Sequence, residues 1–488
     1  MVQLFRCLRV AAVVLGLSWA LGMGSASGLA HAQQERFELG QRLRRFELAW
    51  QAATPEVRRR SVAPMQSAVQ SFFSFQLQTA GRHLDQAYLA MLAEPEASPV
   101  HRFALSRMLK LKSTACDASL REIEFQVQPF YKVDTPAPSD TKVDISLQTW
   151  AGKPICNASF ALQETTAGCK FPIGQLEEGD YRLQASVQAG GESVVFAQRN
   201  WSCIADLEQR LNALDHATGS RSEAAPATEL SSTDRQSIQQ MAAWINASQS
   251  GESLEVDYPA ARLLELCEDL QSEGHDARAI WRRYAQQGDT WMKLAQDKQQ
   301  VVVRLRCPQQ PVGPMPVLFS LHGAGGSENM FFETYGAGRL VDLALQRGWM
   351  VVAPRQGLFG LGMNCAQMLE QLQSVYDIDR SRVFLLGHSM GAMQVVQQTQ
   401  LHPSLPRAAV AVGGGGRLGR RTEPYPFPWF VAAGELDFGR GAAQALADNL
   451  EKTGNTVRYV EIPEVEHMVI VQAALDEIFS FLDNQPQR

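Results

Sequence analysis

A five-residue turn in the last third of the chain constrains the fold most. The apolar run Val383 to Leu386 leads directly into Gly387-His388-Ser389-Met390-Gly391, and the helix-favouring stretch Ala392 to Gln398 follows. Glycines on both sides of Ser389 permit a strained backbone and a close approach of strand to helix. The pattern predicts a strand, a sharp turn that lifts the Ser389 hydroxyl out of the backbone, and a helix.

An acidic residue and a histidine follow Ser389, each on a loop after an apolar run. Asp437 comes after the run 429–433, and His467 comes after the run 457–462. A histidine in such a set accepts the serine proton, while the acid holds the histidine in the correct tautomer. We therefore predict that these three residues act as nucleophile, acid and general base.

The predicted acid and base each have a competitor. Glu435 shares a loop with Asp437 and is the alternative acid. His388 adjoins Ser389, but neighbouring side chains in a tight turn diverge, so His467 is the better general base. We expect His388 to support the geometry of the turn.

A glycine-rich loop follows an earlier apolar run. Residues 317–321 have the pattern of a buried strand and lead into His322-Gly323-Ala324-Gly325-Gly326. Backbone N–H groups of small residues can point at a developing oxyanion without steric conflict. We expect the amides of Ala324 and Met390 to form an oxyanion hole, and an ordinary strand-to-helix turn is the alternative. The residues expected to shape the loop are His322, Gly323 and Gly325.

Eight strand-like runs occupy the last two hundred residues, and helical stretches separate them from the third run onward. This alternation predicts an α/β fold with a mostly parallel eight-stranded sheet covered by helices on both faces. Functional loops in such sheets lie at the carboxyl ends of the strands. The runs are 291–295, 301–306, 317–321, 349–353, 383–386, 408–412, 429–433 and 457–462.

Together these motifs resemble the α/β-hydrolase superfamily. They are most similar to its secreted branch of esterases, which are like polyhydroxybutyrate depolymerases and feruloyl esterases, and more distantly similar to dienelactone hydrolases and prolyl-oligopeptidase-type peptidases. The resemblance covers residues 286–488. It implies a catalytic triad of Ser389, Asp437 and His467. The sequence contains no cofactor or metal signature, so we expect neither.

The resemblance leaves three functions open. The first is a carboxylic ester hydrolase that works through an acyl-enzyme, and its substrate would be a small-molecule or polymer-linked ester. The second is a serine peptidase or an acyltransferase with the same triad. Ala392 stands where prolyl-oligopeptidase-type peptidases usually have a second glycine, which favours the first. The third is an inactive hydrolase fold that serves as a binding module.

The spacing of the triad residues and the aromatic residues nearby say little about the substrate. Only 47 residues separate Ser389 from Asp437, and 29 separate Asp437 from His467, so we expect no large inserted lid and open access. Aromatic residues on nearby loops are candidates for an apolar acyl or aryl pocket, and packing against the sheet is the alternative for each. These candidates are Phe331, Phe332, Tyr335 and Phe359.

The first 32 residues have the pattern of an export signal. Arg6 and Arg9 precede an apolar stretch from Val10 to Gly24, and Ala30 and Ala32 form an Ala-x-Ala pattern. We expect cleavage after Ala32 and a secreted or periplasmic protein, and an uncleaved anchor is the alternative. Cleavage changes the formal net charge from −6 to −8, so nothing attracts nucleic acid or an anionic membrane.

Three further regions are expected between the leader and the hydrolase-like part. Apolar residues recur at helical spacing in 33–115, alternate with a period of two in 116–203, and return to helical spacing in 204–285. We therefore expect a helical region, a β-sandwich and a second helical region. The turn before Tyr181 resembles the tyrosine corner of immunoglobulin-like sandwiches. The expected order is 1–32 signal peptide, 33–115 helical, 116–203 β-sandwich, 204–285 helical linker region and 286–488 catalytic domain.

Cysteine content fits an oxidising compartment. The chain has eight cysteines, and seven of them follow the leader. We expect one disulfide between Cys116 and Cys203 and another between Cys156 and Cys169. Reduced, buried thiols are the alternative.

Overall fold

The computed structural model describes residues 26–92, 98–134, 136–218, 230–273, 276–296, 299–356, 363–419 and 423–485. Most of the predicted signal peptide therefore lies outside the described residues. The first described helix, α2 (Ala26–Ala52), runs through the predicted cleavage point after Ala32. Within the ranges given above, no helix combines the length and the apolar character that a membrane span needs.

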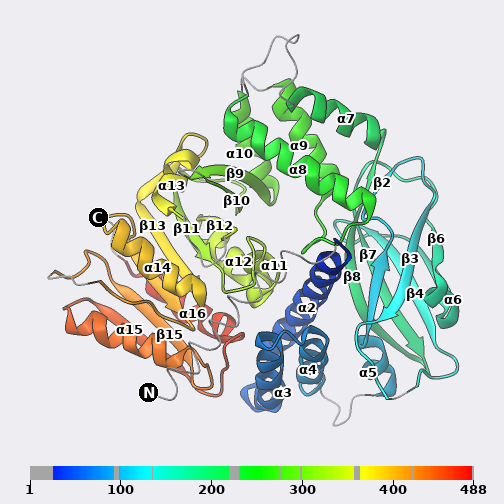
Figure 1. The fold of residues 1–488 in the computed structure, drawn as a ribbon, viewed down its shortest axis with the longest axis horizontal. Coiled ribbons are helices and arrows are strands. Elements are labelled where there is room, and N and C mark those ends of the chain that lie inside the picture. The colour runs from blue at the N-terminus through cyan, green and yellow to red at the C-terminus, as the bar shows by residue number, and fades with distance from the viewer. Residues whose placement is uncertain are drawn as a thin grey trace.

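An eight-stranded sheet organises the carboxyl-terminal part of the chain (Figure 1). Its strands are β9 (Thr290–Gln296), β10 (Gln299–Arg306), β11 (Met315–Leu321), β12 (Met350–Pro354), β13 (Ile378–His388), β14 (Ala408–Val412), β15 (Trp429–Gly434) and β16 (Val457–Ile462). Their order is β16-β15-β14-β13-β11-β12-β10-β9. Only β10 pairs antiparallel with its neighbours, β9 and β12. The predicted mostly parallel sheet and its eight strands are confirmed.

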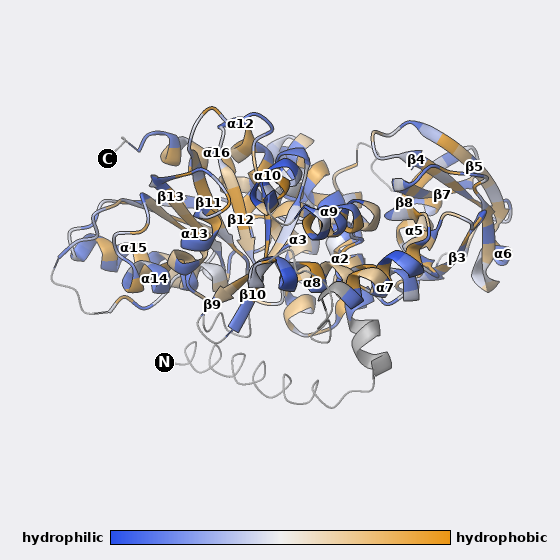
Figure 2. Ribbon diagram, turned by 90° about the horizontal axis from the view of Figure 1, so that it is seen from above, coloured by the Kyte–Doolittle hydropathy of each residue, from blue (hydrophilic) through white to orange (hydrophobic). Residues whose placement is uncertain are grey.

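Helices cover both faces of this sheet because its side chains alternate between them. Phe319 and Leu385 belong to one hydrophobic core, and Leu318 and Leu386 belong to the other. Figure 2 shows the hydrophobic character of the central strands. The first core is completed by α8 (Ser232–Ser250), α9 (Ala260–Ser272), α10 (Ala277–Gln287), α13 (Cys365–Gln373), α14 (Met390–Leu401) and α15 (Arg440–Lys452), and the second by α12 (Arg339–Gln346) and α16 (Ile470–Asp483).

Three amino-terminal helices also belong to the second core. They are α2, α3 (Pro55–Phe73) and α4 (Leu77–Leu89), and Figure 1 shows them between the hydrolase sheet and the β-rich region. Leu43 and Phe46 of α2 are buried in the same cluster as Leu318 of β11. The buried Arg42 guanidinium binds Asp85 of α4 at 2.9 Å and so fixes α2 against α4. These helices therefore belong to the same hydrophobic core as one face of the sheet.

The β-rich region contains two sheets, ordered β1-β3-β6 and β2-β8-β7-β4-β5. Its strand β1 lies inside the range 33–115 that we expected to be helical, so the helices of that range end at Leu105. The Tyr181 hydroxyl donates a hydrogen bond to the Glu177 carbonyl at 2.7 Å. The immunoglobulin-like assignment stays a prediction. The elements are α5 (Pro99–Leu105), β1 (Arg107–Leu111), β2 (Ala115–Asp117), β3 (Glu122–Pro129), β4 (Lys142–Thr149), β5 (Pro154–Ala161), α6 (Leu162–Ala167), β6 (Cys169–Pro172), β7 (Gly179–Ala189), β8 (Glu192–Ile204) and α7 (Leu207–Thr218).

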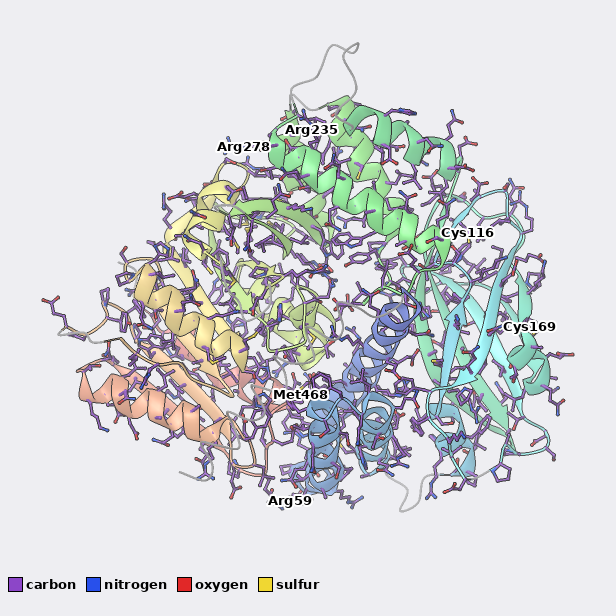
Figure 3. The ribbon with its side chains drawn as sticks, viewed as in Figure 1. Arg59, Cys116, Cys169, Arg235, Arg278 and Met468 are labelled. Atoms are coloured by element: carbon purple, nitrogen blue, oxygen red, sulfur yellow. The ribbon has the colours of Figure 1, made fainter. Side chains whose placement is uncertain are left out.

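Both expected disulfides are absent from the described part of the chain, where all seven cysteines are free thiols. Cys156 lies on β5 and Cys169 on β6, and these strands belong to different sheets rather than to one hairpin. Cys116 and Cys203 are register partners on β2 and β8, yet their sulfur atoms are not bonded. Figure 3 shows Cys116 and Cys169 at separate places in the β-rich region.

Candidate active site

Ser389 stands at a strained turn between β13 and α14. Its backbone has φ 56° and ψ −113°, which a residue with a side chain rarely adopts. The flanking glycines are required by close contacts. A Cβ on Gly387 would lie 2.1 Å from the Gly391 carbonyl oxygen, and a Cβ on Gly391 would lie 1.9 Å from that of Leu321. The sequence therefore forces the serine hydroxyl outward, over the carboxyl ends of the strands.

The structure brings Ser389, His467 and Asp437 into one hydrogen-bonded line. His467 Nε2 lies 2.9 Å from Ser389 Oγ, and His467 Nδ1 lies 2.7 Å from Asp437 Oδ1. Because the carboxylate can only accept, Nδ1 carries the hydrogen and Nε2 is free to accept the hydroxyl proton. The side chains of His467 and Asp437 are almost fully buried.

Asp437 is held in its charged form. Burial alone would raise the pKa of its carboxyl, but the hydrogen bond and charge of His467 and the Gly439 amide outweigh burial, so the pKa lies below its ordinary value. The Gly439 N–H donates to Asp437 Oδ1 at 2.6 Å. Glu435, the alternative acid, is exposed, and its carboxylate accepts the Glu464 N–H at 3.0 Å.

His388 links the turn of Ser389 to the loop of His467. Its Nε2–H donates to the His467 carbonyl at 2.9 Å, and its Nδ1 accepts the Tyr335 hydroxyl at 2.9 Å. Burial, assisted by the neighbouring His467, lowers the pKa of His388 to about 3. The imidazole of His388 is therefore neutral, and both of its nitrogens are occupied by groups other than Ser389.

The glycine-rich loop lies directly beside Ser389. A Cβ on Gly323 would be 3.3 Å from the Ser389 Cβ, and Gly325 has a φ of 77°. His322 braces the loop, since its Nδ1–H donates to the Gly323 carbonyl at 2.8 Å and its Nε2 accepts the Gln356 N–H at 3.1 Å. Burial lowers the pKa of His322 to about 4, which keeps this imidazole neutral.

The two amides expected to form the oxyanion hole belong to this neighbourhood. Ala324 lines the same cavity as Ser389. Met390 is the first residue of α14, and the first amides of a helix have no partner within it. Both residues therefore lie next to Ser389, and their role as oxyanion donors stays a prediction.

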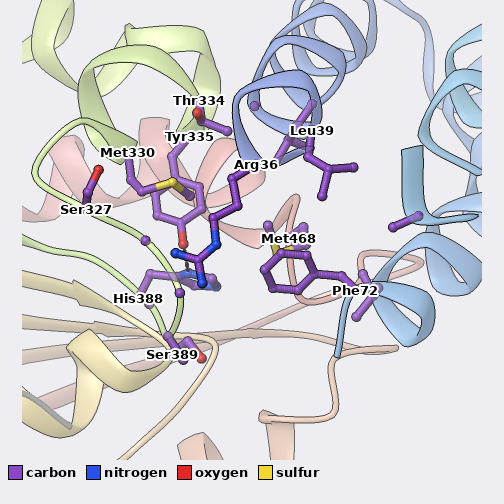
Figure 4. Close-up of a pocket in the computed structure, with 18 of the residues that line it drawn as sticks. Arg36, Leu39, Phe72, Ser327, Met330, Thr334, Tyr335, His388, Ser389 and Met468 are labelled. Carbon is purple, nitrogen blue, oxygen red and sulfur yellow. Dashed lines mark hydrogen bonds between the residues drawn. The ribbon is translucent and has the colours of Figure 1, made fainter. Parts of the chain in front are cut away.

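An apolar cavity of about 110 Å³ opens onto Ser389 (Figure 4). Residues of α2, α3 and α4 line it and form its roof, which the expectation of open access did not include. Counting residues between Ser389, Asp437 and His467 could not detect this cover, because it comes from the other end of the chain. The apolar lining includes Leu39, Leu43, Met65, Ala68, Val69, Phe72, Phe73, Ala80, Leu84, Met330 and Met468.

Two of the aromatic residues predicted to line the pocket are elsewhere. Phe331 is fully buried and packs edge-on against Tyr335, with 5.0 Å between ring centroids. Phe332 lies under the Arg304 guanidinium and lines a separate, polar cavity. Tyr335 does line the cavity beside Ser389. Phe359 lies outside the described residues.

Two aromatic rings that the sequence analysis did not select cover His467. The Phe438 ring centroid is 3.9 Å from that of His467, and the Phe73 ring centroid of α3 is 6.0 Å away. Phe73 also packs edge-on against Phe438. Phe438 follows the acid directly, which is a local signal that could have identified it, whereas Phe73 is more than three hundred residues away in the chain.

A buried carboxyl lies next to His467. Glu466 accepts the N–H groups of Met468 and Val469 at 2.7 and 2.9 Å, just before α16 begins. Burial raises the pKa of Glu466 to about 7, against the effect of these two donors. Glu47 of α2 is also buried, and its pKa lies well above the ordinary value. Sequence reasoning gave neither residue a role.

The fold and the site geometry agree with a comparison of the sequence with known families. A profile of the Alpha/beta hydrolase family matches residues 317–478, from β11 into α16. The carboxyl-terminal domain is an alpha/beta hydrolase. The match begins after β9 and β10 of the sheet. No curated protein matches the chain in a sequence search.

Solved structures with some likeness to the hydrolase domain include three bacterial enzymes. One is a feruloyl esterase module from Clostridium thermocellum (13% identity, TM-score 0.36, covering 41% of this chain and 89% of that chain). Another is Est1E from Butyrivibrio proteoclasticus (13% identity, TM-score 0.33, covering 40% of this chain and 98% of that chain). The third is an S-formylglutathione hydrolase from Agrobacterium tumefaciens (15% identity, TM-score 0.35, covering 41% of this chain and 94% of that chain). Similarity at this level assigns no substrate to this chain.

Proposed function

We propose that this protein is a serine hydrolase that cleaves carboxylic esters with a catalytic triad of Ser389, His467 and Asp437. The observation that carries the proposal is the continuous line of hydrogen bonds from the Ser389 hydroxyl through His467 to a charged, buried Asp437. This line lies at the carboxyl ends of the strands of an alpha/beta hydrolase domain, where such sheets place their reactive groups.

Acylation begins when Ser389 Oγ attacks the ester carbonyl carbon. His467 Nε2 takes the hydroxyl proton, and the imidazolium is stabilised by Asp437. The negative charge that develops on the carbonyl oxygen is accepted by the amides of Ala324 and Met390. The bond from the carbonyl carbon to the alcohol oxygen then breaks, and His467 gives its proton to the departing alcohol.

Deacylation uses the same groups with water as the nucleophile. His467 removes a proton from a water molecule, and the hydroxide attacks the acyl carbon of the acyl-enzyme. The bond to Ser389 Oγ breaks, the carboxylic acid leaves, and the proton on His467 returns to the serine. No cofactor enters either half of the reaction.

We also propose export and a modular architecture. The leader pattern of residues 1–32 supports cleavage after Ala32 and a secreted or periplasmic enzyme. The remaining regions would be a helical region 33–115, an immunoglobulin-like β-sandwich 116–203, a helical region 204–285 and the catalytic region 286–488. Amino-terminal sequencing of the protein from the culture medium or periplasm should begin at Gln33, and an uncleaved amino terminus would contradict export by this route.

A fluorophosphonate probe tests the triad directly. The purified protein should be labelled at Ser389, and the Ser389→Ala variant should not. Hydrolysis of p-nitrophenyl esters should fall by about four orders of magnitude or more in Ser389→Ala and in His467→Ala. An unlabelled wild-type protein would identify the domain as an inactive binding module, and faster turnover of dipeptidyl amides than of esters would identify a peptidase.

A further inference from the structure

We infer that helices α2, α3 and α4 form the binding site for the acyl part of the substrate, and that this part is an apolar group longer than acetyl. The inference rests on the proposed function, because it names the substrate class of the same serine. The residues that carry it come from the amino-terminal helices and not from the part of the chain that matches the hydrolase family.

Each of the three helices presents one face to the cavity. In α2 the lining residues Leu39, Gly40 and Leu43 follow Arg36 at intervals of three and four, and in α3 and α4 the lining residues have the same spacing. Such spacing places side chains on a single face of a helix. The lining residues of the other two helices are Met65, Ala68, Val69 and Phe72 in α3, and Ala80 and Leu84 in α4.

Gly40 of α2 leaves space in the wall of the cavity, although no neighbouring atom requires a glycine at this position. A Cβ at this position would meet only Thr334 Oγ1, at an ordinary contact distance of 3.6 Å. Glycine in a helix interior destabilises the helix by about 1 kcal/mol relative to alanine. The missing side chain therefore widens the cavity between α2 and the hydrolase, which suits a ligand.

The cavity joins this wall to the reacting groups. Ser389, His467 and the loop residues Gly323 and Ala324 line it together with the helices. Figure 4 shows Leu39 and Phe72 on one side of the cavity and Ser389 at its base. A chain attached to a carbonyl at Ser389 can therefore extend along the helices without leaving apolar surroundings.

Charged groups at the rim indicate the orientation of the ester. The Arg36 guanidinium is 3.7 Å from Glu255, and the two side chains are 46% and 24% exposed. Both residues line the cavity, and their partial exposure places them where it meets solvent. Since apolar surface buries the acyl chain and polar groups face solvent, the alcohol part points to the rim and can depart during acylation.

Initial rates on p-nitrophenyl esters of acetate, butyrate, octanoate and dodecanoate test the inference. Each buried methylene should raise kcat/KM by up to about fourfold, so octanoate should exceed acetate by at least about tenfold. Acetate esters of butanol and octanol, which lengthen only the alcohol, should give no such increase. A rise with alcohol length, or equal rates on all four acyl esters, would overturn the inference.

Two substitutions that place a larger side chain in the cavity test where the acyl group binds. Ala68→Phe and Gly40→Leu should each lower the octanoate-to-acetate ratio of kcat/KM at least about tenfold. Ala63→Phe places the same ring on the exposed face of α3 and should keep the wild-type ratio. Unchanged ratios in both filling variants, with wild-type melting temperatures, would overturn the assignment of the acyl site to these helices.

The same experiment separates the inference from the proposed function. If the wild-type protein is not labelled by the fluorophosphonate probe and hydrolyses none of the esters, the proposed function fails. If it is labelled and hydrolyses acetate but shows no dependence on acyl length, only the acyl site is wrong.

Discussion

Burial decides the protonation of single residues around Ser389. Two of the three imidazoles near the serine, His322 and His388, are kept neutral by burial, which lowers the pKa of each well below its ordinary value. Asp437 is equally enclosed but stays charged because His467 and the Gly439 amide stabilise its carboxylate. These environments support the proposed roles of His467 as the base and Asp437 as its charged partner.

The two carboxylates of one loop should therefore respond differently to amide substitution. Asp437→Asn should lower kcat on p-nitrophenyl butyrate by about four orders of magnitude at pH 7, since the amide favours the wrong tautomer of His467. Glu435→Gln, on the same loop but exposed, should stay within about threefold of wild type. A large loss in Glu435→Gln would reverse the assignment of the acid.

Glu466 should make stability depend on pH. Its pKa is about 7 in the folded protein against 4.5 ordinarily, so between these values the folded state holds a proton that the unfolded chain releases. The stabilising contribution is full below pH 4.5 and is lost as the pH rises through 7. Between pH 5 and 8 the unfolding free energy of wild type should fall by on the order of 3 kcal/mol more than that of Glu466→Gln. Denaturant unfolding at each pH measures this difference.

Substitution of an exposed carboxylate provides the control for this pH effect. Glu451 lies in α15 and is exposed to solvent. Glu451→Gln should keep the wild-type dependence of unfolding free energy on pH. Parallel pH profiles for wild type and Glu466→Gln would show that Glu466 is not the group responsible.

At the scale of elements, the turn between β13 and α14 depends on backbone contact. The strand and helix approach so closely that no side chain fits at Gly387 or Gly391. This packing is what holds Ser389 at a positive φ. The nucleophile is therefore positioned by the fit of two elements, and weakening that fit should affect folding as well as activity.

Two glycine substitutions test this dependence, and we expect one to destabilise the protein and the other to stabilise it. Gly391→Ala should lower the unfolding free energy by more than about 3 kcal/mol or prevent folding, because its Cβ overlaps the Leu321 carbonyl. Gly441→Ala, in α15 with no atom within 4 Å of the new Cβ, should raise stability by up to about 1 kcal/mol. Thermal melts of both variants measure the difference, and a stable, active Gly391→Ala protein would contradict the packing.

Local patterns explain which parts of the site were predictable. Ser389 and its glycines form a contiguous motif, and Asp437 and His467 each follow a short strand that the sequence pattern predicts. The roof was not predictable, because helical spacing in residues 33–115 shows that a face is apolar but not what it covers. Phe331 and Phe332 follow the oxyanion loop in sequence, yet the short helix α11 (Met330–Glu333) turns both away from the cavity beside Ser389.

For the whole molecule, the hydrolase sheet shares both of its cores with segments before residue 286. Residues of α2 and α4 complete one core, and residues of α8 to α10 complete the other. In the described part of the chain the helical regions are thus structural parts of the hydrolase. Removing them would expose apolar residues on both sheet faces.

A fragment of residues 286–488 should therefore not fold to an active enzyme. We expect it to aggregate or to bind a hydrophobic dye, and to show less than about 1% of the esterase activity of the full chain, because it loses both cores and the cavity roof. Size-exclusion chromatography and ester hydrolysis check this. A monomeric, active fragment would show that the amino-terminal helices are dispensable.

The shared core also sets an order of events during synthesis. Leu43 and Phe46 belong to the same cluster as Ile478 and Phe479, which the ribosome adds more than four hundred residues later. Contacts over such a separation form slowly, because a long loop must close before any of them is gained. The roof can therefore pack over Ser389 only after α16 has been synthesised, so the proposed active site should be completed late in folding.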